Sequence, residues 1–172
     1  EFYGYESGRP AVFSIRESTK EDVSHAPFYF QDKQLLSFDK EALQEIRISG
    51  VYQITLAPQD TLGWYIHSDS SFNVEDSDMN RLSSGLEGVS AAELVTANPD
   101  GSSDYGLKQP FLEVVITDTL GISTGFIIGD SNEDNDRYAS SKNLERIYLV
   151  RISQVERITD WIEEILDSEE KT

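Results

Sequence analysis

The sequence predicts an α+β domain built mainly from an antiparallel sheet, with helices packed on one face of that sheet. Three observations support this prediction. Several short runs alternate apolar and polar residues with a period of two, which is typical of half-buried strands. The links between many of these runs are short, and short links join antiparallel strands. Two longer runs carry apolar residues three or four positions apart, as a helix does when it buries one face.

Residues 1–38 are expected to form a separate N-terminal segment. Glycines, prolines and a charged run interrupt it, and within its first 27 residues only 11–15 resembles a strand. A second hypothesis comes from a weak internal similarity, because apolar residues between Phe28 and Ile46 have the same spacing as those between Tyr148 and Leu166. On this hypothesis the segment is repeat-derived and closes a preceding copy of the fold.

The α+β domain is expected to occupy residues 39–167. Asp39 is placed to cap a short helix that runs to about Ile46. Alternating residues then predict two strands, 46–49 and 51–56, separated by a glycine. A third strand is expected at 64–66, where two aromatic residues precede an isoleucine.

A second helix is expected after residue 76, with Ser77 or Asp78 as its N-cap. Its apolar stripe consists of Met79, Leu82, Leu86 and Val89. A strand is predicted at 93–95. Residues 98–104 are predicted to be a loop, because nearly all of them favour turn geometry.

The C-terminal third predicts a hairpin, further strands and a closing helix. Residues 112–116 and 122–128 alternate and flank a turn at 118–121. Further strands are expected at 138–139 and 147–150. The last helix shows a capping box, Ser153 and Glu156, ahead of an apolar stripe of Val155, Ile158, Ile162 and Ile165. A polar tail, 168–172, ends the chain.

The charge balance limits the classes of partner. The chain has 32 acidic and 14 basic residues and a formal net charge of −18. Phosphate-rich surfaces repel such a chain, so we expect neither nucleic-acid binding nor direct binding to anionic membranes. The absence of cysteine excludes disulfides and thiolate metal sites. Hydrophobic residues make up 38% of the chain, which is enough for a packed core.

The sequence shows no convincing catalytic constellation, and we predict a protein without catalytic residues that is not an enzyme. Ser90 lies in a sequence resembling a nucleophile elbow, but Ala92 replaces the second glycine and a helix precedes it. His67 has Ser68 and Asp69 as neighbours, and three adjacent residues point in different directions. His67 and His25 are therefore interpreted as surface histidines.

One acidic run suggests a cofactor. It places oxygen ligands at alternate positions, Asp130, Asn132, Asp134 and Asp136. A calcium loop has this alternation, but it also needs Gly at its sixth position and Glu at its twelfth, where this chain has Asn135 and Ser141. We favour a solvated hairpin loop and predict no metal site, with calcium as the alternative.

Motifs spread over residues 40–167 resemble a bacterial family catalogued as domain of unknown function 4340. Its members commonly show a W-x-I strand, a Y-G-L-x-x-P turn, a strand ending in I-G and a V-Y-x-V strand. The residues that carry the resemblance here are Trp64, Tyr105, Gly106, Leu107, Pro110, Gly129, Tyr138 and Tyr148. We interpret them as structural, since glycines allow close backbone approach and such aromatic residues usually pack in or beside a core.

The resemblance implies a location and a kind of function. Members are usually tethered by an N-terminal membrane helix on the extracytoplasmic face, some beside transporter components, and no catalytic residues or cofactors are established for them. We therefore expect an upstream anchor that this chain, which starts at Glu1, does not include. The leading hypothesis is a non-enzymatic binding or assembly module of the bacterial cell envelope with a protein partner.

Two alternatives remain open. Surface carboxylates could serve a hydrolase that acts on envelope polysaccharide or peptide. The acidity could also imitate nucleic acid, provided that the carboxylates gather on one face.

Overall fold

The computed structural model forms two compact units, residues 1–32 and 33–172. The residues that the structure describes are 2–5, 12–15, 32–59, 63–67, 69–96, 105–142 and 146–169. The predicted loop at 98–104 and His25 lie outside them. In the first unit, β1 (Phe2–Tyr5) and β2 (Val12–Ile15) form an antiparallel hairpin. This confirms the strand expected at 11–15, whereas β1 was not predicted.

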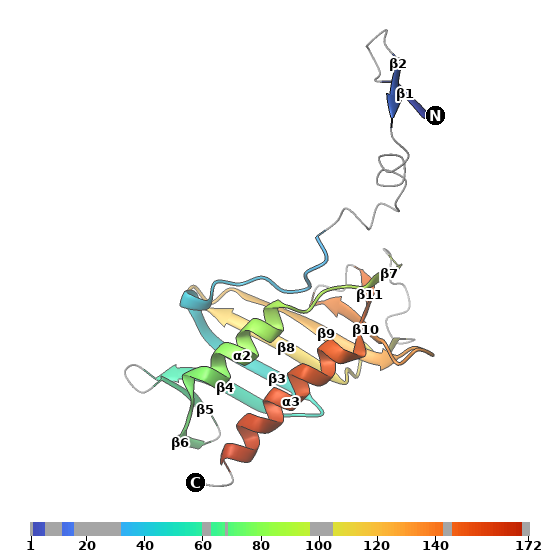
Figure 1. Cartoon of the computed structure of the whole chain (residues 1–172). Helices are drawn as coiled ribbons and strands as arrows, with labels where there is room; N and C mark the ends of the chain where they lie inside the picture. The colour runs from blue at the N-terminus through green and yellow to red at the C-terminus, as the bar shows by residue number, and fades with distance from the viewer. Residues whose placement is uncertain are drawn as a thin grey trace. The chain divides into compact units, whose positions relative to one another are not determined.

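The second unit contains a nine-stranded antiparallel sheet among its described residues, which confirms the α+β class (Figure 1). Across the sheet the order is β6-β5-β4-β3-β8-β9-β10-β11-β7. In chain order the strands are β3 (Leu43–Gly50), β4 (Ile54–Gln59), β5 (Gly63–Ile66), β6 (Asp69–Val74), β7 (Glu93–Thr96), β8 (Leu112–Asp118), β9 (Ser123–Ser131), β10 (Arg137–Ser141) and β11 (Ile147–Val150).

Two helices, α2 (Asp76–Glu87) and α3 (Ile152–Glu169), lie side by side on one face of this sheet (Figure 1). Their packing depends on Gly85, because a Cβ atom there would lie 2.0 Å from Cζ3 of Trp161. A glycine on α2 therefore makes room for the indole ring of α3. None of the helices among the described residues is long and apolar enough to cross a membrane.

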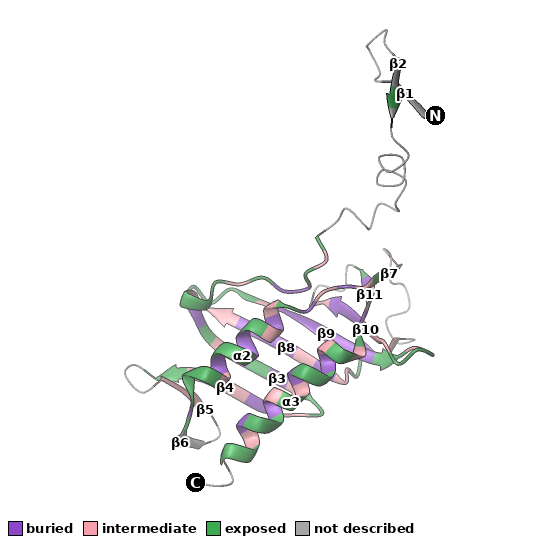
Figure 2. Cartoon of the chain, in the orientation of Figure 1, coloured by how far each residue is buried: buried purple, intermediate pink, exposed green. Residues whose placement is uncertain are grey.

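The main core lies between the helices and the sheet, where buried residues line the facing surfaces (Figure 2). Every second residue of the central strands points toward the helices, as the period of a strand requires. Fully buried examples from both layers are Ile46, Leu56, Ile116, Phe126, Leu82, Leu86 and Ile162. We call the opposite side of the sheet its outer face.

The helix expected from Asp39 to Ile46 is wrong beyond its first turn. The chain forms only a 3-10 helix, η2 (Lys40–Ala42), before β3 begins at Leu43. Asp39 does act as the cap, since its Oδ1 accepts a hydrogen bond of 3.0 Å from the Glu41 amide. Pairing with β8 outweighs the local helical spacing, because it satisfies the backbone along the whole of β3.

Three helix boundaries also differ from the predictions. The N-cap of α2 is Glu75 rather than Ser77 or Asp78. Ser153 lies inside the first turn of α3, because that helix begins one residue earlier, so Ser153 is not its cap. At the other end, Ser168 is helical rather than part of the tail, and its hydroxyl donates to the Glu164 carbonyl. β6 was not predicted, because its sequence is mostly polar.

The internal similarity does not correspond to a structural repeat over the positions that can be compared. Ala42 lies in the 3-10 helix and Ile46 in a strand, whereas Ile162 and Leu166 both lie in α3. Equal apolar spacing therefore serves two different backbone conformations.

Candidate functional site

A second apolar cluster lies on the outer face of the sheet. Residues 105–110, which we call the cover segment, place Leu107 against Ile127 of β9 and Ile147 of β11. Ile127 points away from the helices, since its neighbours Phe126 and Ile128 belong to the main core. The cover segment thus closes one part of the outer face.

Two glycines let the cover segment approach the sheet. A Cβ atom on Gly129 would lie 2.0 Å from the Tyr105 carbonyl oxygen. Gly106 has a φ of +71°, and a Cβ atom there would lie 2.6 Å from the Asp130 amide nitrogen. Any side chain at either position would push the segment away from the sheet.

Aromatic packing completes the cluster. The rings of Tyr105 and Tyr138 meet edge to face, with centroids 4.8 Å apart. The Arg137 guanidinium lies 3.8 Å from the centroid of the Phe111 ring and donates a 3.0 Å hydrogen bond to the Gly129 carbonyl. Such contacts stabilise a closed surface rather than present a ligand site.

The structure therefore brings together five of the residues that carry the family resemblance: Tyr105, Gly106, Leu107, Gly129 and Tyr138. The other three family-motif residues do not take part in the contacts among these five. Pro110 ends the cover segment, Trp64 lies on β5 between Pro58 and Val74, and Tyr148 lies on β11 opposite Ala139.

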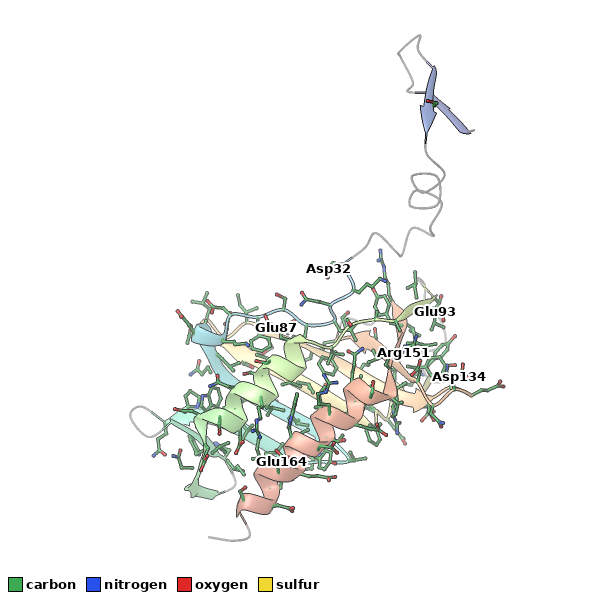
Figure 3. The ribbon with its side chains drawn as sticks, in the orientation of Figure 1. Asp32, Glu87, Glu93, Asp134, Arg151 and Glu164 are labelled. Carbon is green, nitrogen blue, oxygen red and sulfur yellow. The ribbon has the colours of Figure 1, made fainter. Side chains whose placement is uncertain are left out.

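The acidic run that suggested calcium begins in β9 at Asp130 and continues through the turn to β10, where Figure 3 labels Asp134. Oδ1 of Asp136 accepts a 3.1 Å hydrogen bond from the Ile152 amide at the start of α3, and its Oδ2 lies 3.4 Å from Arg151. Oδ1 of Asn132 accepts from the Asp134 amide at 3.0 Å. Two of the four candidate ligands thus have structural partners.

In the part of the chain that the structure describes, no group of three His, Cys, Asp or Glu side chains is placed to hold a metal ion. Calcium binding by Asp130, Asn132, Asp134 and Asp136 stays the untested alternative to the predicted absence of a metal site. A calorimetric titration with calcium measures it directly.

The other candidate residues are also separated. Ser90 forms an isolated β-bridge with Gln34, and its amide donates to Oε1 of Gln154 at 2.9 Å. Ser90 therefore lies in a β-bridge and not in the sharp strand-to-helix turn that a nucleophile elbow requires. His67 is exposed just after β5, and its ring lies 6.3 Å from that of Tyr65.

Carboxylates are spread over the described part of the chain. Figure 3 labels Glu87 at the end of α2, Glu93 on β7, Asp134 in the β9–β10 turn and Glu164 on α3. Nucleic-acid mimicry needs carboxylates gathered on one face, whereas these four belong to four different elements.

Hollows on the surface of the described part of the second unit differ in their chemistry. The helix groove is lined by Ser84, Gly85, Gly88, Gln154, Arg157, Ile158 and Trp161. The outer-face hollow is lined by Gln44, Glu45, Ala57, Pro58, Tyr65, His67 and Thr117. The hairpin hollow is mostly apolar and is lined by Ser37, Phe38, Asp39, Ala42, Leu43, Ile116, Asp118, Ile122 and Thr124.

The turn of the β8–β9 hairpin displays two apolar side chains beside the hairpin hollow. Leu120 is 82% exposed and Ile122 is 62% exposed. Oδ1 of Asp118 accepts hydrogen bonds of 2.9 Å from both of their amides, and the Thr119 amide donates to the Ala42 carbonyl at 2.8 Å. This turn is therefore held in place while its apolar side chains face solvent.

Sequence reasoning predicted this hairpin but missed its exposed side chains. The sequence Asp118-Thr119-Leu120-Gly121 was interpreted as a turn only. The available signal was Leu120 itself, since turn positions usually carry polar or small residues.

The family described as "Domain of unknown function (DUF4340)" matches residues 64–170, which is more than half of the chain. The chain belongs to this family. The match confirms the resemblance found in the sequence, and it runs from β5 to α3, so that β3 and β4 of this DUF4340 chain precede it. No curated protein and no solved structure matches the chain.

Proposed function

We propose that this chain is a non-enzymatic binding or assembly module of the bacterial cell envelope that captures a protein partner through the β8–β9 turn. The observation that carries the proposal is the exposure of Leu120 and Ile122 beside the hairpin hollow. Exposed apolar side chains beside an apolar hollow are typical of interaction sites on folded proteins.

The rim of the hollow suggests the chemistry of the partner. Two carboxylates, Asp39 and Asp118, stand at a mostly apolar opening. Lys40 does not neutralise them, since its Nζ lies 3.0 Å from the Ser84 hydroxyl and 3.4 Å from Glu87. The matching partner segment inserts an apolar side chain and carries Lys or Arg next to it.

The location is part of the same proposal. Family membership supports an extracytoplasmic position near a membrane, with an anchor upstream of this chain and with transporter components as candidate partners. A net charge of −18 supports a basic partner rather than an anionic lipid surface.

Site-specific photo-crosslinking tests the proposal. A photo-reactive amino acid at position 120 is expected to give one discrete adduct in an envelope extract, and Ile122→Asp in the same chain is expected to remove it. The matched control position is Val51, which is 54% exposed and follows the opposite end of β3. Equal adducts from positions 51 and 120, or none from position 120, would contradict the proposal.

A further inference from the structure

The outer-face hollow has a different chemistry from the hairpin hollow. It is a shallow depression of about 460 Å³ that combines an aromatic ring with polar groups. Tyr65, His67 and Ala57 provide its ring-bearing and apolar part, and Gln44, Glu45 and Thr117 provide its polar part. A ligand that fits both needs an apolar face and a polar edge in the same small molecule.

Tyr65 and His67 provide a platform of two rings. Tyr65 lies between Ala57 and Asn73 in the sheet, and it points to the outer face because Ile66 is buried on the helix side. The planes of the two rings differ by 32°, with centroids 6.3 Å apart. The backbone at His67 is fixed, because its amide donates to the Thr55 carbonyl at 2.8 Å.

Hydrogen-bonding groups of both kinds surround the platform. The Glu45 carboxylate lies 2.6 Å from Nη2 of Arg47, and these side chains are 31% and 57% exposed. The pair carries little net charge, and it offers both hydrogen-bond acceptors and donors to a ligand. Glu45 follows an irregularity in the β3–β8 pairing, and such bulges re-aim side chains.

We infer that the outer-face hollow binds a neutral saccharide. A pyranose ring has C–H faces that stack on aromatic rings, and its edge of hydroxyl groups donates and accepts hydrogen bonds. Tyr65 and His67 match the faces, while Gln44, Thr117 and the Glu45–Arg47 pair match the edge. The chain's charge of −18 disfavours anionic glycans. This site is independent of the protein docking proposed for the β8–β9 turn.

Amide NMR of the 172-residue chain tests the inference with four probes: cellotriose, maltotriose, the N-acetylglucosamine trimer and, as an anionic comparison, the galacturonic acid trimer. At least one neutral trimer is expected to shift the amides of Tyr65, His67 and Thr117 at millimolar concentration. Tyr65→Ala is expected to weaken binding about tenfold, whereas Tyr65→Phe keeps the ring and stays within about twofold.

Control variants separate this inference from the proposed function. Leu120→Ser is expected to leave saccharide binding unchanged, although it removes an apolar side chain of the docking surface. If Tyr65→Ala does not fold, the exposed His67→Ala replaces it and is expected to weaken binding about threefold. The inference is overturned if no neutral trimer shifts these amides, if loss of the ring leaves binding unchanged, or if the anionic trimer binds equally well.

Discussion

The two halves of the outer face of the sheet differ in what lies on them. Over β9, β10 and β11 the cover segment buries Leu107 against Ile127 and Ile147. Over β4 and β3, and at the end of β8, the same face presents Ala57, Arg47 and Thr117, which are exposed or half-buried. Both halves share one antiparallel sheet and one main core. The cover segment, which lies outside the sheet, therefore determines which half of the outer face is buried.

Most of the residues that carry the family resemblance belong to the covered half, where glycines and aromatic side chains hold the cover segment. The open half keeps polar side chains on a rigid support, which is the arrangement expected of a binding surface. The comparison separates residues that stabilise the fold from residues that are available to a ligand.

The sharpest test of this difference is one substitution made in two places. Leu107→Ala is expected to cost about 2–5 kcal/mol in the free energy of unfolding, because it leaves a cavity in the covered cluster. Leu120→Ala, at a side chain that is 82% exposed, is expected to change it by less than about 0.5 kcal/mol. Urea unfolding measures both variants. Equal losses would show that the cover segment adds no separate core.

Adding a methyl group tests how closely the cover segment approaches. Gly129→Ala is expected to destabilise the fold by about 1–3 kcal/mol, because the new Cβ atom meets the Tyr105 carbonyl. Near-ultraviolet circular dichroism should also weaken as Tyr105 and Tyr138 separate. The control is Ala57→Val on the open half, which is expected to stay within about 0.5 kcal/mol. A neutral Gly129→Ala would contradict the tight contact.

A substitution of Asp136 tests whether the acidic turn between β9 and β10 stabilises the start of α3. Asp136→Ala is expected to cost about 0.5–2 kcal/mol, because the first turn of α3 loses the acceptor for the Ile152 amide. Asp134→Ala changes an exposed carboxylate in the same turn and is expected to be near neutral. Thermal unfolding compares the two variants. If both variants have the same thermal unfolding midpoint, Asp136 does not act as the N-terminal cap of α3.

Tyr52, which lies between β3 and β4, links these strands of the open half to helix α3. Its hydroxyl donates to Oε1 of Glu163 on α3 at 2.5 Å. Burial, followed by the hydrogen bond and charge of Glu163, raises the pKa of Tyr52 from 10.0 to about 12. The folded state therefore holds this proton more tightly than the unfolded chain does. The resulting stability is complete below pH 10 and is lost as the pH rises toward about 12.

Urea unfolding across this alkaline range is the measurement, together with tyrosinate absorbance. Tyr52→Phe is expected to remove this part of the alkaline loss of stability, together with a tyrosinate signal that develops near pH 12. A tyrosinate signal near pH 12 that is the same in Tyr52→Phe as in the parent chain would disprove the coupling to Glu163.

The sequence predicted most of the sheet, because alternation over parts of β3, β4, β8 and β9 was long enough to define one buried face. It failed at Leu43, where helical spacing competed with a strand partner more than 60 residues away. It also failed at β6, whose polar sequence becomes a strand only through pairing with β5. A strand distant in the sequence decided the first case, and pairing with the adjacent strand decided the second.

The sites were less predictable than the fold. The family motifs pointed to Tyr105, Gly106 and Gly129, but their meeting depends on the path of the cover segment. The two proposed binding surfaces were not foreseen, since exposure of Leu120 and the position of Tyr65 on an open face are tertiary properties. Alternation in the sequence shows which residues share a face of the sheet, but not which part of that face another segment covers.

The strand order also has a consequence for the order of folding. Strands β3 to β6 and β8 to β11 each form a meander of neighbours in sequence, and the two meanders meet at the β3–β8 seam. Across that seam Ser49 donates to Glu113, which is 64 residues away. Closing such a long loop costs more entropy than forming a hairpin, so we expect the meanders to form early and the seam to close late. We therefore expect closure of this seam, at the centre of the finished sheet, to limit the rate at which the sheet assembles.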